Sequence, residues 1–198
     1  MSFYFFGSDL EVKNLNSMVL LQFRSNQKDG KVDLRLNSLR FFRDKSSLEK
    51  YCKRKSLEML VSSPKRAKIN MESIFTLKDR IMEYSQGKRI DLAEISQKMN
   101  LLEVKALFQT EFSRKVIRYL LNNVKYGDTV SYSGIGNGID SRAYQAIGTV
   151  LKSNPLPLII PCHRVIRKDG TIGGFMGKSQ ENNGWEINLK KKLLELET

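Results

Sequence analysis

The chain has 198 residues, and its 34 lysines and arginines outnumber its 21 aspartates and glutamates, which gives a formal net charge of +13. One histidine and two cysteines cannot supply the four Cys and His ligands of a structural zinc site, and two cysteines do not make a disulfide framework. No apolar run approaches the ~18 residues of a transmembrane helix, so one or two domains with a polyanionic partner are expected.

The N-terminal half predicts strands followed by helices. Strands are expected over residues 17–24 and 31–36, because the second segment alternates apolar and polar residues and a turn signal lies between the two. Helices are expected over residues 46–61, 72–86 and 91–99. This mixture predicts a small α/β domain.

A polar and basic segment, residues 62–70, is expected to be an exposed loop. Within it, Pro64-Lys65-Arg66-Ala67-Lys68 resembles a short nuclear-import signal, a pattern that also arises by chance. A domain boundary is expected near Leu107, so that residues 1–106 form an N-terminal domain and residues 107–198 a C-terminal one.

The C-terminal half predicts two amphipathic helices. Residues 111–124 carry apolar side chains on one helical face, and Gly127 is a candidate C-cap. Residues 133–139 hold three glycines without the spacing of a phosphate-binding loop and predict an irregular connection. The next helix is expected to open at Asp140 or Ser141. Its expected buried positions are Ala143, Ala146, Ile147, Val150 and Leu151.

The outer face of this second helix is small, polar and basic. It carries Gln145, Gly148, Thr149 and Lys152. Such a face, after a helix and a turn, fits the recognition helix of a helix-turn-helix. It also fits any amphipathic surface helix, and the segment by itself does not decide between the two.

Cys162 stands in the most informative segment of the chain. Residues 156–160 predict a short buried strand that ends at Pro161, and Cys162 then lies beside His163, the chain's one histidine. A cysteine after an apolar strand is commonly a small core residue. A thiol beside an imidazole is also the arrangement of an activated nucleophile, so both interpretations are open at this level.

Several segments in order resemble the O6-alkylguanine-DNA alkyltransferases. They are Phe112…Val116…Leu120, Tyr126-Gly127-Asp128-Thr129-Val130-Ser131-Tyr132, Ala146-Ile147-Gly148, Asn154-Pro155, Ile159-Ile160-Pro161-Cys162-His163-Arg164-Val165-Ile166, Asp169-Gly170-Thr171-Ile172-Gly173-Gly174-Phe175 and Lys190…Leu193-Leu194…Glu197. The resemblance covers residues 108–177 and 189–197. It implies DNA repair by one irreversible transfer of a methyl or other alkyl group from guanine O6 to Cys162, with no cofactor. Some members of the family carry zinc ligands, but this sequence has no matching set, so no metal is expected.

The resemblance also implies an α+β architecture. The N-terminal mixed α/β domain would be ribonuclease-H-like, and the C-terminal domain, which carries the cysteine, would be a winged-helix-like helix-turn-helix domain. The partner would be double-stranded DNA containing O6-alkylguanine, whose damaged nucleotide must leave the base stack. The protein would act as a monomer, in the nucleus if residues 64–68 are an import signal and otherwise inside the cell with DNA.

Individual residues take roles from the same resemblance. Glu197 would orient His163, and His163 would deprotonate Cys162 through a water. Tyr132 would donate a proton or hydrogen bond to guanine N3. The expected substrate-binding residues are Asn154, Val165, Met176 and Gly177. The expected DNA-binding residues are Arg142, Tyr144, Gln145, Gly148, Lys152 and Arg164, the last of which would also anchor backbone near the site.

The chain departs from the family pattern at several positions. Gln145 stands where an arginine is usual, and a neutral amide lacks the charge and planar fork of a guanidinium, so weaker base extrusion is expected. The segment Gly177–Leu189 is longer than the family's lid. Met176 and Phe175 are expected to change the wall of the guanine pocket.

Three other functions compete with alkyl transfer. A non-repairing relative that binds alkylguanine DNA but flips bases poorly fits Gln145, whereas Cys162 argues against it. A thiol hydrolase or transferase would need an oxyanion site and would leave the basic excess unexplained. A purely architectural DNA binder would need no reactive cysteine.

Overall fold

The computed structural model describes residues 3–6, 11–12, 15, 17–28, 31–55, 58–59, 71–179 and 184–198. The chain divides into two compact units, Met1–Lys88 with Ile95–Glu103, and Arg89–Glu94 with Val104–Thr198. The second unit thus has two segments, Arg89–Glu94 and Val104–Thr198, whereas the sequence predicted a single boundary near Leu107. The expected basic loop 62–70, with its candidate import signal 64–68, lies outside the described residues.

The first unit is built on a small sheet around two long antiparallel strands, β3 (Ser17–Lys28) and β4 (Lys31–Phe42). Both strands were predicted from the sequence, and both are longer than predicted. β1 (Phe3–Phe6) and β2 (Glu11–Val12) pair antiparallel with β3, and β5 (Glu58–Met59) pairs parallel with β1.

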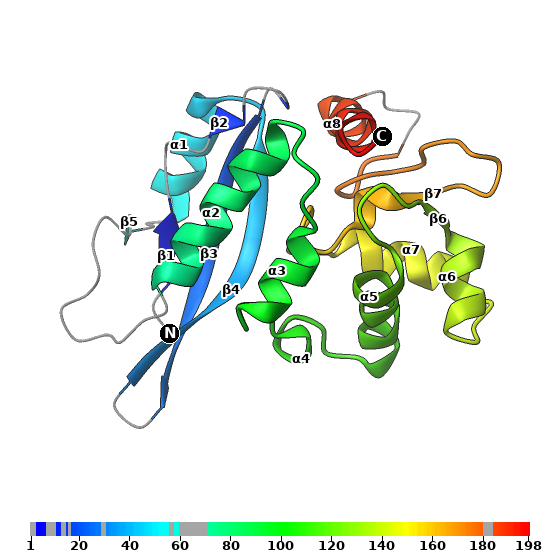
Figure 1. The fold of residues 1–198 in the computed structure, drawn as a ribbon, viewed down its shortest axis with the longest axis horizontal. Helices are drawn as coiled ribbons and strands as arrows, with labels where there is room; N and C mark the ends of the chain where they lie inside the picture. Colours follow the sequence, from blue (N-terminus) through cyan, green and yellow to red (C-terminus); the bar gives the residue numbers. More distant parts are fainter. Residues whose placement is uncertain are drawn as a thin grey trace. The chain divides into compact units, whose positions relative to one another are not determined.

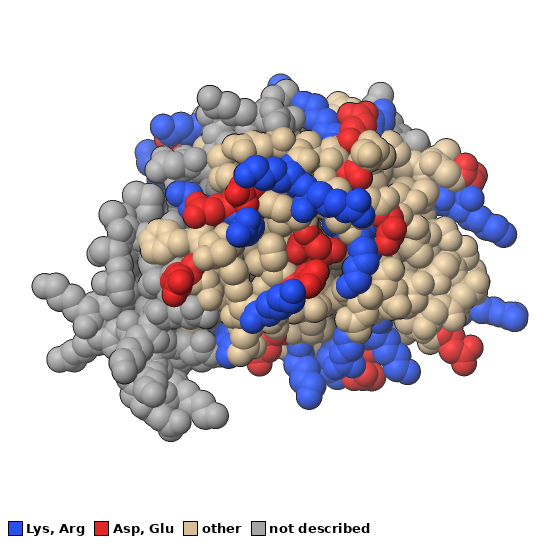
Figure 2. Space-filling model, viewed as in Figure 1, with Lys and Arg blue, Asp and Glu red and all other residues tan. Residues whose placement is uncertain are grey.

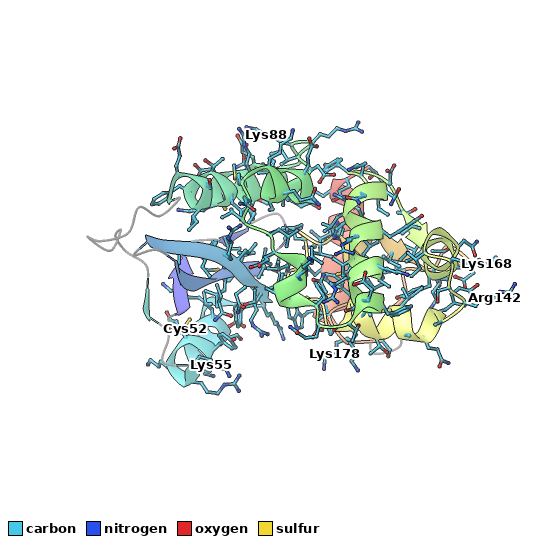
Figure 3. The ribbon with its side chains drawn as sticks, turned by 90° about the horizontal axis from the view of Figure 1, so that it is seen from below. Cys52, Lys55, Lys88, Arg142, Lys168 and Lys178 are labelled. Atoms are coloured by element: carbon cyan, nitrogen blue, oxygen red, sulfur yellow. The ribbon has the colours of Figure 1, made fainter. Side chains whose placement is uncertain are left out.

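Helices cover both faces of this sheet. α2 (Met71–Ser85) lies on one face and α1 (Lys45–Lys55) on the other, as Figures 1 and 3 show. The helix was expected over residues 46–61, but α1 ends at Lys55, and Glu58–Met59 form β5 instead. The buried residues Ile74, Leu77, Ile81 and Tyr84 recur at the helical spacing along α2. α3 (Leu92–Lys98) follows close to its predicted position.

The second unit is mainly helical. It contains α4 (Val104–Leu107), α5 (Glu111–Asn123), α6 (Tyr132–Gly138), α7 (Tyr144–Lys152) and α8 (Trp185–Leu196). Two short parallel strands, β6 (Val130–Ser131) and β7 (Val165–Ile166), join the start of α6 to the cysteine segment. Val116, Ile117 and Leu120 bury the predicted apolar face of α5.

The prediction of an irregular connection over residues 133–139 is wrong, because these residues form α6. The Ser131 hydroxyl caps the helix by accepting a hydrogen bond from Gly134 N at 3.0 Å. A Cβ atom on Gly138 would collide with the ring of Tyr119, and one on Gly136 would press on Ser141 and Tyr144. Glycine here permits close packing between helices rather than a loop.

Two further expectations in this unit need correction. α7 opens at Tyr144, not at Asp140 or Ser141, and Ala143 and Ala146 are exposed while Ile147, Val150 and Leu151 are buried. Residues 156–160 are buried as expected but form no strand. Leu158 has a φ of 79°, and Ile160 N bonds back to Leu156 O at 2.8 Å, so this segment is a turn.

No helix among the described residues is long and apolar enough to cross a bilayer. The architecture is therefore a mixed α/β unit followed by a helical unit in which the cysteine segment lies between α7 and α8.

Candidate functional site

Cys162 opens a single 3-10 turn, Cys162–Arg164, between the buried turn at residues 156–160 and β7. Its side chain is almost fully buried, and its backbone N donates to Ile160 O at 2.7 Å. The thiol lies at the pocket beside Asn154, whereas the two basic side chains that follow it both reach Glu197.

Asn154 holds the thiol and the turn together. Its Nδ2 atom lies 3.0 Å from Cys162 Sγ and 3.1 Å from Ile160 O, and its Oδ1 atom accepts from Leu156 N at 2.9 Å. The amide therefore uses its donors and its acceptor within the segment that presents the cysteine. A donor on sulfur stabilises the thiolate form.

His163 and Arg164 converge on Glu197 in the interior. His163 Nε2 lies 2.9 Å from Glu197 Oε1, while Arg164 Nε and a second guanidinium nitrogen lie 2.8 Å from Oε2 and 3.0 Å from Oε1. Arg164 also donates to Val124 O at 3.0 Å, and Asp91 lies 3.7 Å away. This is a buried bidentate arginine–carboxylate pair with an imidazole on the same carboxylate.

The network determines the protonation of the imidazole. Burial of Glu197 would raise its pKa, but the hydrogen bonds and charges of His163 and Arg164 outweigh burial and hold that pKa far below its usual range. Burial of His163 lowers its pKa despite the opposing effect of Glu197. A neutral imidazole beside an ionised carboxylate donates through Nε2–H. Nδ1, which has no hydrogen-bond partner among the described residues, is then the basic nitrogen.

Lys190 is a buried cation with no role predicted from the sequence. Its Nζ atom donates to Val165 O at 2.6 Å, Ile172 O at 2.7 Å and Gly174 O at 3.1 Å, which uses all three ammonium donors. Burial lowers the pKa of Lys190 to about 8. The sequence did contain a signal for this burial, because the lysine stands at a buried position of α8, beside Leu189 and one turn before Leu193.

Burial raises the pKa of Cys162, and this effect exceeds the lowering by the Asn154 hydrogen bond and by the charge of Lys190. The thiol is therefore protonated at neutral pH until a base removes its proton. The site joins a protonated nucleophile, a neutral buried imidazole and a nearby cation. This combination suits proton removal coupled to nucleophilic attack.

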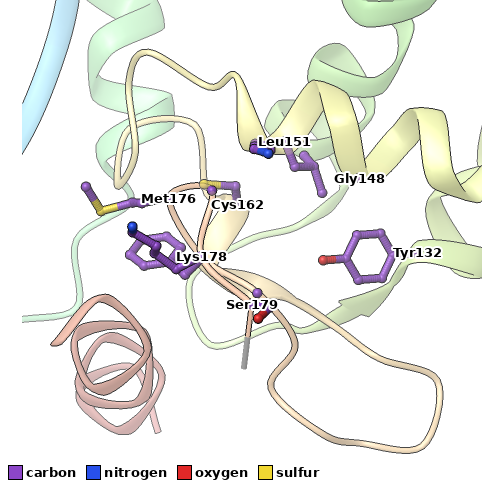
Figure 4. A pocket seen from close by; sticks show the side chains of 11 residues that line it. Tyr132, Gly148, Leu151, Cys162, Met176, Lys178 and Ser179 are labelled. Carbon is purple, nitrogen blue, oxygen red and sulfur yellow. The ribbon is translucent and has the colours of Figure 1, made fainter. Parts of the chain in front are cut away.

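A pocket of about 230 Å³ opens over Cys162. Figure 4 shows the ring of Tyr132 across the pocket from Cys162, with its hydroxyl directed inward. Burial, followed by the effect of Cys162, raises the pKa of Tyr132, so the phenol keeps its proton and can donate it. The lining is completed by Gly148, Leu151, Lys152, Gly174, Phe175, Met176, Gly177, Lys178 and Ser179.

A tight hairpin turn forms one wall of this pocket. Phe175 and Lys178 exchange two backbone hydrogen bonds of 3.0 and 2.9 Å around Met176 and Gly177. Both central residues have positive φ, 48° for Met176 and 81° for Gly177, which is a turn that glycine and asparagine favour and methionine does not. The backbone at Met176, which forms part of the pocket wall, is therefore strained, and the two hydrogen bonds fix its conformation.

The expected DNA-binding residues separate into three groups. Arg142, Tyr144 and Gln145 are exposed before and within α7, and Figure 3 shows Arg142 and Lys168 pointing outward at the same end of the second unit. Gly148 and Lys152 line the pocket. Arg164 does not belong with them: it is 2% exposed and bound inside the Glu197 network, so its assignment as a DNA contact is corrected.

The expected catalytic and substrate residues are distributed as follows. Cys162, Tyr132, Met176 and Gly177 line the pocket. Asn154 bonds to the thiol, and His163 and Glu197 bond to each other. Val165 is fully buried on β7, where its carbonyl accepts from Lys190.

Sequence comparisons with known proteins match the chain to one family. Residues 111–198 match the family model described as the DNA-binding domain of 6-O-methylguanine DNA methyltransferase. A Mus musculus protein named methylated-DNA–protein-cysteine methyltransferase is 44% identical over 81 residues, which span 39% of this chain but only 37% of the mouse protein. A protein of the same name from Metallosphaera sedula is 33% identical over 129 residues, 65% of this chain and 70% of that protein.

Solved structures show the same fold at low sequence identity. The O6-methylguanine-DNA methyltransferase of Pyrococcus kodakaraensis KOD1 superposes with a TM-score of 0.58 and 22% identity, over 98% of each chain. Mycobacterium tuberculosis OGT in complex with DNA superposes with a TM-score of 0.52 and 23% identity, over 100% of this chain and 92% of that one.

Proposed function

Because the chain belongs to the methylated-DNA–protein-cysteine methyltransferase family, we propose that it repairs DNA by moving a methyl or other alkyl group from guanine O6 to Cys162. The bond between O6 and the alkyl carbon breaks as a bond between that carbon and Sγ forms. The thiol proton passes to the departing guanine, so guanine and a thioether are the products. A thioether is stable, so each molecule acts once.

The position of Cys162 carries this proposal. Cys162 lines the pocket, and its thiol accepts a hydrogen bond from Asn154. The next residue in the chain is His163, which bonds to Glu197. With Nε2–H committed to Glu197, Nδ1 of His163 is the nitrogen that would take the thiol proton, through a water. Tyr132, across the pocket, would donate to guanine N3 as the base leaves.

DNA binding is assigned to the second unit. We take α6 and α7 as the helix-turn-helix of a winged-helix-like domain and the first unit as a ribonuclease-H-like domain. Arg142, Tyr144 and Gln145 would then contact duplex DNA beside the extruded nucleotide, with Lys152 at the pocket. The match of residues 111–198 to a DNA-binding-domain model supports DNA binding by this unit, and the Mycobacterium tuberculosis OGT structure is a complex with DNA.

The partner is proposed to be duplex DNA containing O6-alkylguanine, bound by a monomer. Location in the nucleus depends on residues 64–68 and stays a prediction. Cys162 in the pocket argues against the non-repairing alternative, in which the damaged base is bound but no alkyl group moves.

The test is a mass measurement. The protein is incubated with duplex DNA containing one O6-methylguanine, and its peptides are then searched for a methyl group. The expected adduct is on the Cys162 peptide, it is lost in Cys162→Ala, and it is kept in the matched variant Cys52→Ala. An unmodified Cys162 at excess DNA, or a methyl group on Cys52 instead, would refute the proposal.

A further inference from the structure

The chemistry above uses residues of the second unit alone, yet the first unit carries a dense basic surface. We propose that the exposed side of α1, together with the end of β4, is a second DNA-binding surface that holds backbone phosphates without regard to sequence. This basic surface consists of Arg40, Arg43, Lys45, Lys50, Lys53, Arg54 and Lys55, all of them exposed.

α1 is fixed to the sheet by its apolar side. Leu48 is 2% exposed and packs with Met18 and Leu20 of β3, and Tyr51 and Cys52 pack against the same cluster. At 100° per residue, Lys50, Lys53 and Arg54 lie on the opposite side of the helix. The basic side chains are therefore presented from a helix whose orientation within this unit is determined by packing.

An aromatic ring joins the cations of α1 to those of β4. The guanidinium carbon of Arg40 lies 5.3 Å from the centroid of the Tyr51 ring, and that of Arg54 lies 5.8 Å from it. Cation–π contacts hold both side chains close to one ring without neutralising either charge. Their planar donor groups stay free to bind phosphate oxygens in pairs.

The cations of this surface are not tied up in ion pairs among the described residues. None of its seven cations forms an ion pair with another residue in the described part of the chain. Of its two nearby carboxylates, Asp44 accepts from Ser47 N at 2.7 Å at the start of α1, and Glu49 is the other. Seven cations against two carboxylates leave a positive excess on the described part of this surface, which an external anion can neutralise.

α2, on the other face of the sheet, shows the contrast. There Arg80 and Lys88 lie 2.6 and 2.9 Å from the carboxylate of Glu83, and Figure 2 shows basic and acidic side chains next to one another over this helix. An ordinary solvated face pairs its charges in this way. The charges of α1 form no such pairs within the described ranges, and Figure 3 shows Lys55 projecting outward, so the two helices differ in this respect.

DNA fits this surface better than a membrane does. A helix that lies on a bilayer exposes apolar residues to insert between lipids, whereas the apolar side of α1 is buried against the sheet and its outer side is polar. Phosphates along one DNA strand recur about every 3.4 Å of helix axis, so an 11-residue helix about 16 Å long can meet several of them. Each phosphate neutralised releases counterions.

The test uses an unmodified duplex, so its outcome does not depend on whether Cys162 accepts an alkyl group. Binding of the full chain is measured by fluorescence anisotropy over a series of salt concentrations. The triple variant Lys50→Gln/Lys53→Gln/Arg54→Gln is compared with a matched variant, Lys105→Gln/Lys115→Gln/Lys191→Gln, which removes three exposed charges from the second unit. Thermal unfolding confirms that each variant is folded.

The α1 variant is expected to lower the slope of log K against log salt by up to about 2.7, at about 0.9 for each phosphate that the protein no longer neutralises, and the matched variant to change it much less. Should the triple variant fail to fold, Lys53→Gln alone is expected to lower the slope by about 0.9. Equal slopes for the α1 variant and the unchanged chain would overturn the proposal. So would an equal loss in the matched variant, or a defect seen only with vesicles rich in phosphatidylserine.

Discussion

His163 and Glu197 lie 34 positions apart in the chain, yet Nε2 of one meets Oε1 of the other at 2.9 Å in the interior of the second unit. The same carboxylate holds Arg164, the residue after the histidine. One C-terminal side chain therefore orients two consecutive residues of the cysteine turn. The end of α8 is as much a part of the candidate site as the Pro-Cys-His segment.

Replacing Glu197 tests this relationship. Glu197→Gln removes the ionised bidentate partner of the buried Arg164 and leaves only Asp91, 3.7 Å away, so the free energy of unfolding is expected to fall by about 3 kcal/mol. Methyl transfer from bound DNA is expected to slow as well, because His163 loses the carboxylate that orients it. Glu195→Gln, on the exposed side of α8, is the control for both urea unfolding and transfer rate. Equal stability of the two variants would contradict this account.

Acid is expected to have the same effect as that substitution. The pKa of Glu197 is depressed in the folded protein, so its contribution to stability is complete above the unfolded value of about 4.3 and is lost as the pH falls below it. The difference in unfolding free energy between the unchanged chain and Glu197→Gln should shrink below pH 4. A difference that stays constant down to pH 2 would rule out this carboxylate as the cause.

The rate of alkyl transfer should depend on pH in a defined direction. The pKa of His163 is lowered by burial, so the imidazole is neutral at pH 7 and transfer should decline only below its ordinary pKa of about 6.5. The pKa of Cys162 is raised, so the rate should still increase at alkaline pH as the thiolate forms. Single-turnover rates on bound DNA in Asn154→Ala should show this alkaline rise moved to higher pH, whereas Asn188→Ala should not.

Lys190→Met is expected to destabilise the second unit at neutral pH, by about 3 kcal/mol, because three carbonyl groups lose their donor. The pKa of about 8 fixes the sign of the pH effect. Between pH 8 and 10.5, Lys190 is protonated in the unfolded chain but deprotonated in the folded one. The free energy of unfolding of the unchanged chain therefore rises with pH over this range, relative to that of Lys190→Met. Denaturant unfolding across this range measures the rise, with the exposed Lys191→Met as control. A difference in unfolding free energy between the unchanged chain and Lys190→Met that falls with pH would contradict the prediction.

Gln145→Arg should improve repair on duplex DNA. A guanidinium provides the charge and planar fork that the exposed Gln145 amide lacks, so the transfer rate on duplex is expected to rise on the order of tenfold, about 1.4 kcal/mol of barrier. The rate on single-stranded DNA should change little, because no base must be extruded. Thr149→Arg adds the same charge one turn along α7. An equal gain in both variants would mean that charge alone is responsible.

Met176→Gly tests the strained pocket wall. Glycine takes a positive φ readily, so the variant should relieve about 1 kcal/mol of backbone strain and widen the pocket. Transfer of a benzyl group relative to a methyl group is expected to increase, as measured by competition between the two DNA substrates. Met176→Leu keeps a bulky side chain and should not change this ratio. A higher ratio of benzyl to methyl transfer in both variants would mean that the turn is not the cause.

Local patterns predicted much of the fold. The strand pair β3–β4, the helices α2 and α5, and the prominence of Cys162 and His163 follow from periodicity and from neighbouring residues, which act over a few positions. The same reasoning failed at α6, because two of the three glycines there, Gly136 and Gly138, pack against Tyr119, Ser141 and Tyr144, and this packing cannot be seen in the segment itself. It failed again at the end of α1, where pairing with β1 turned Glu58 and Met59 into a strand.

The sequence by itself determined that a thiol follows a buried segment beside the chain's one imidazole, on a strongly basic chain. Only the tertiary structure decided that Arg164 is an internal partner of Glu197 rather than a surface contact, and that Lys190 joins three backbone carbonyls, one of them of the pocket residue Gly174. The physical reason is the distance along the chain over which each interaction acts. Capping and periodicity are local, whereas the bonds from Glu197 to the cysteine turn close loops of 33 and 34 residues, and burial of a charge depends on what those loops bring together.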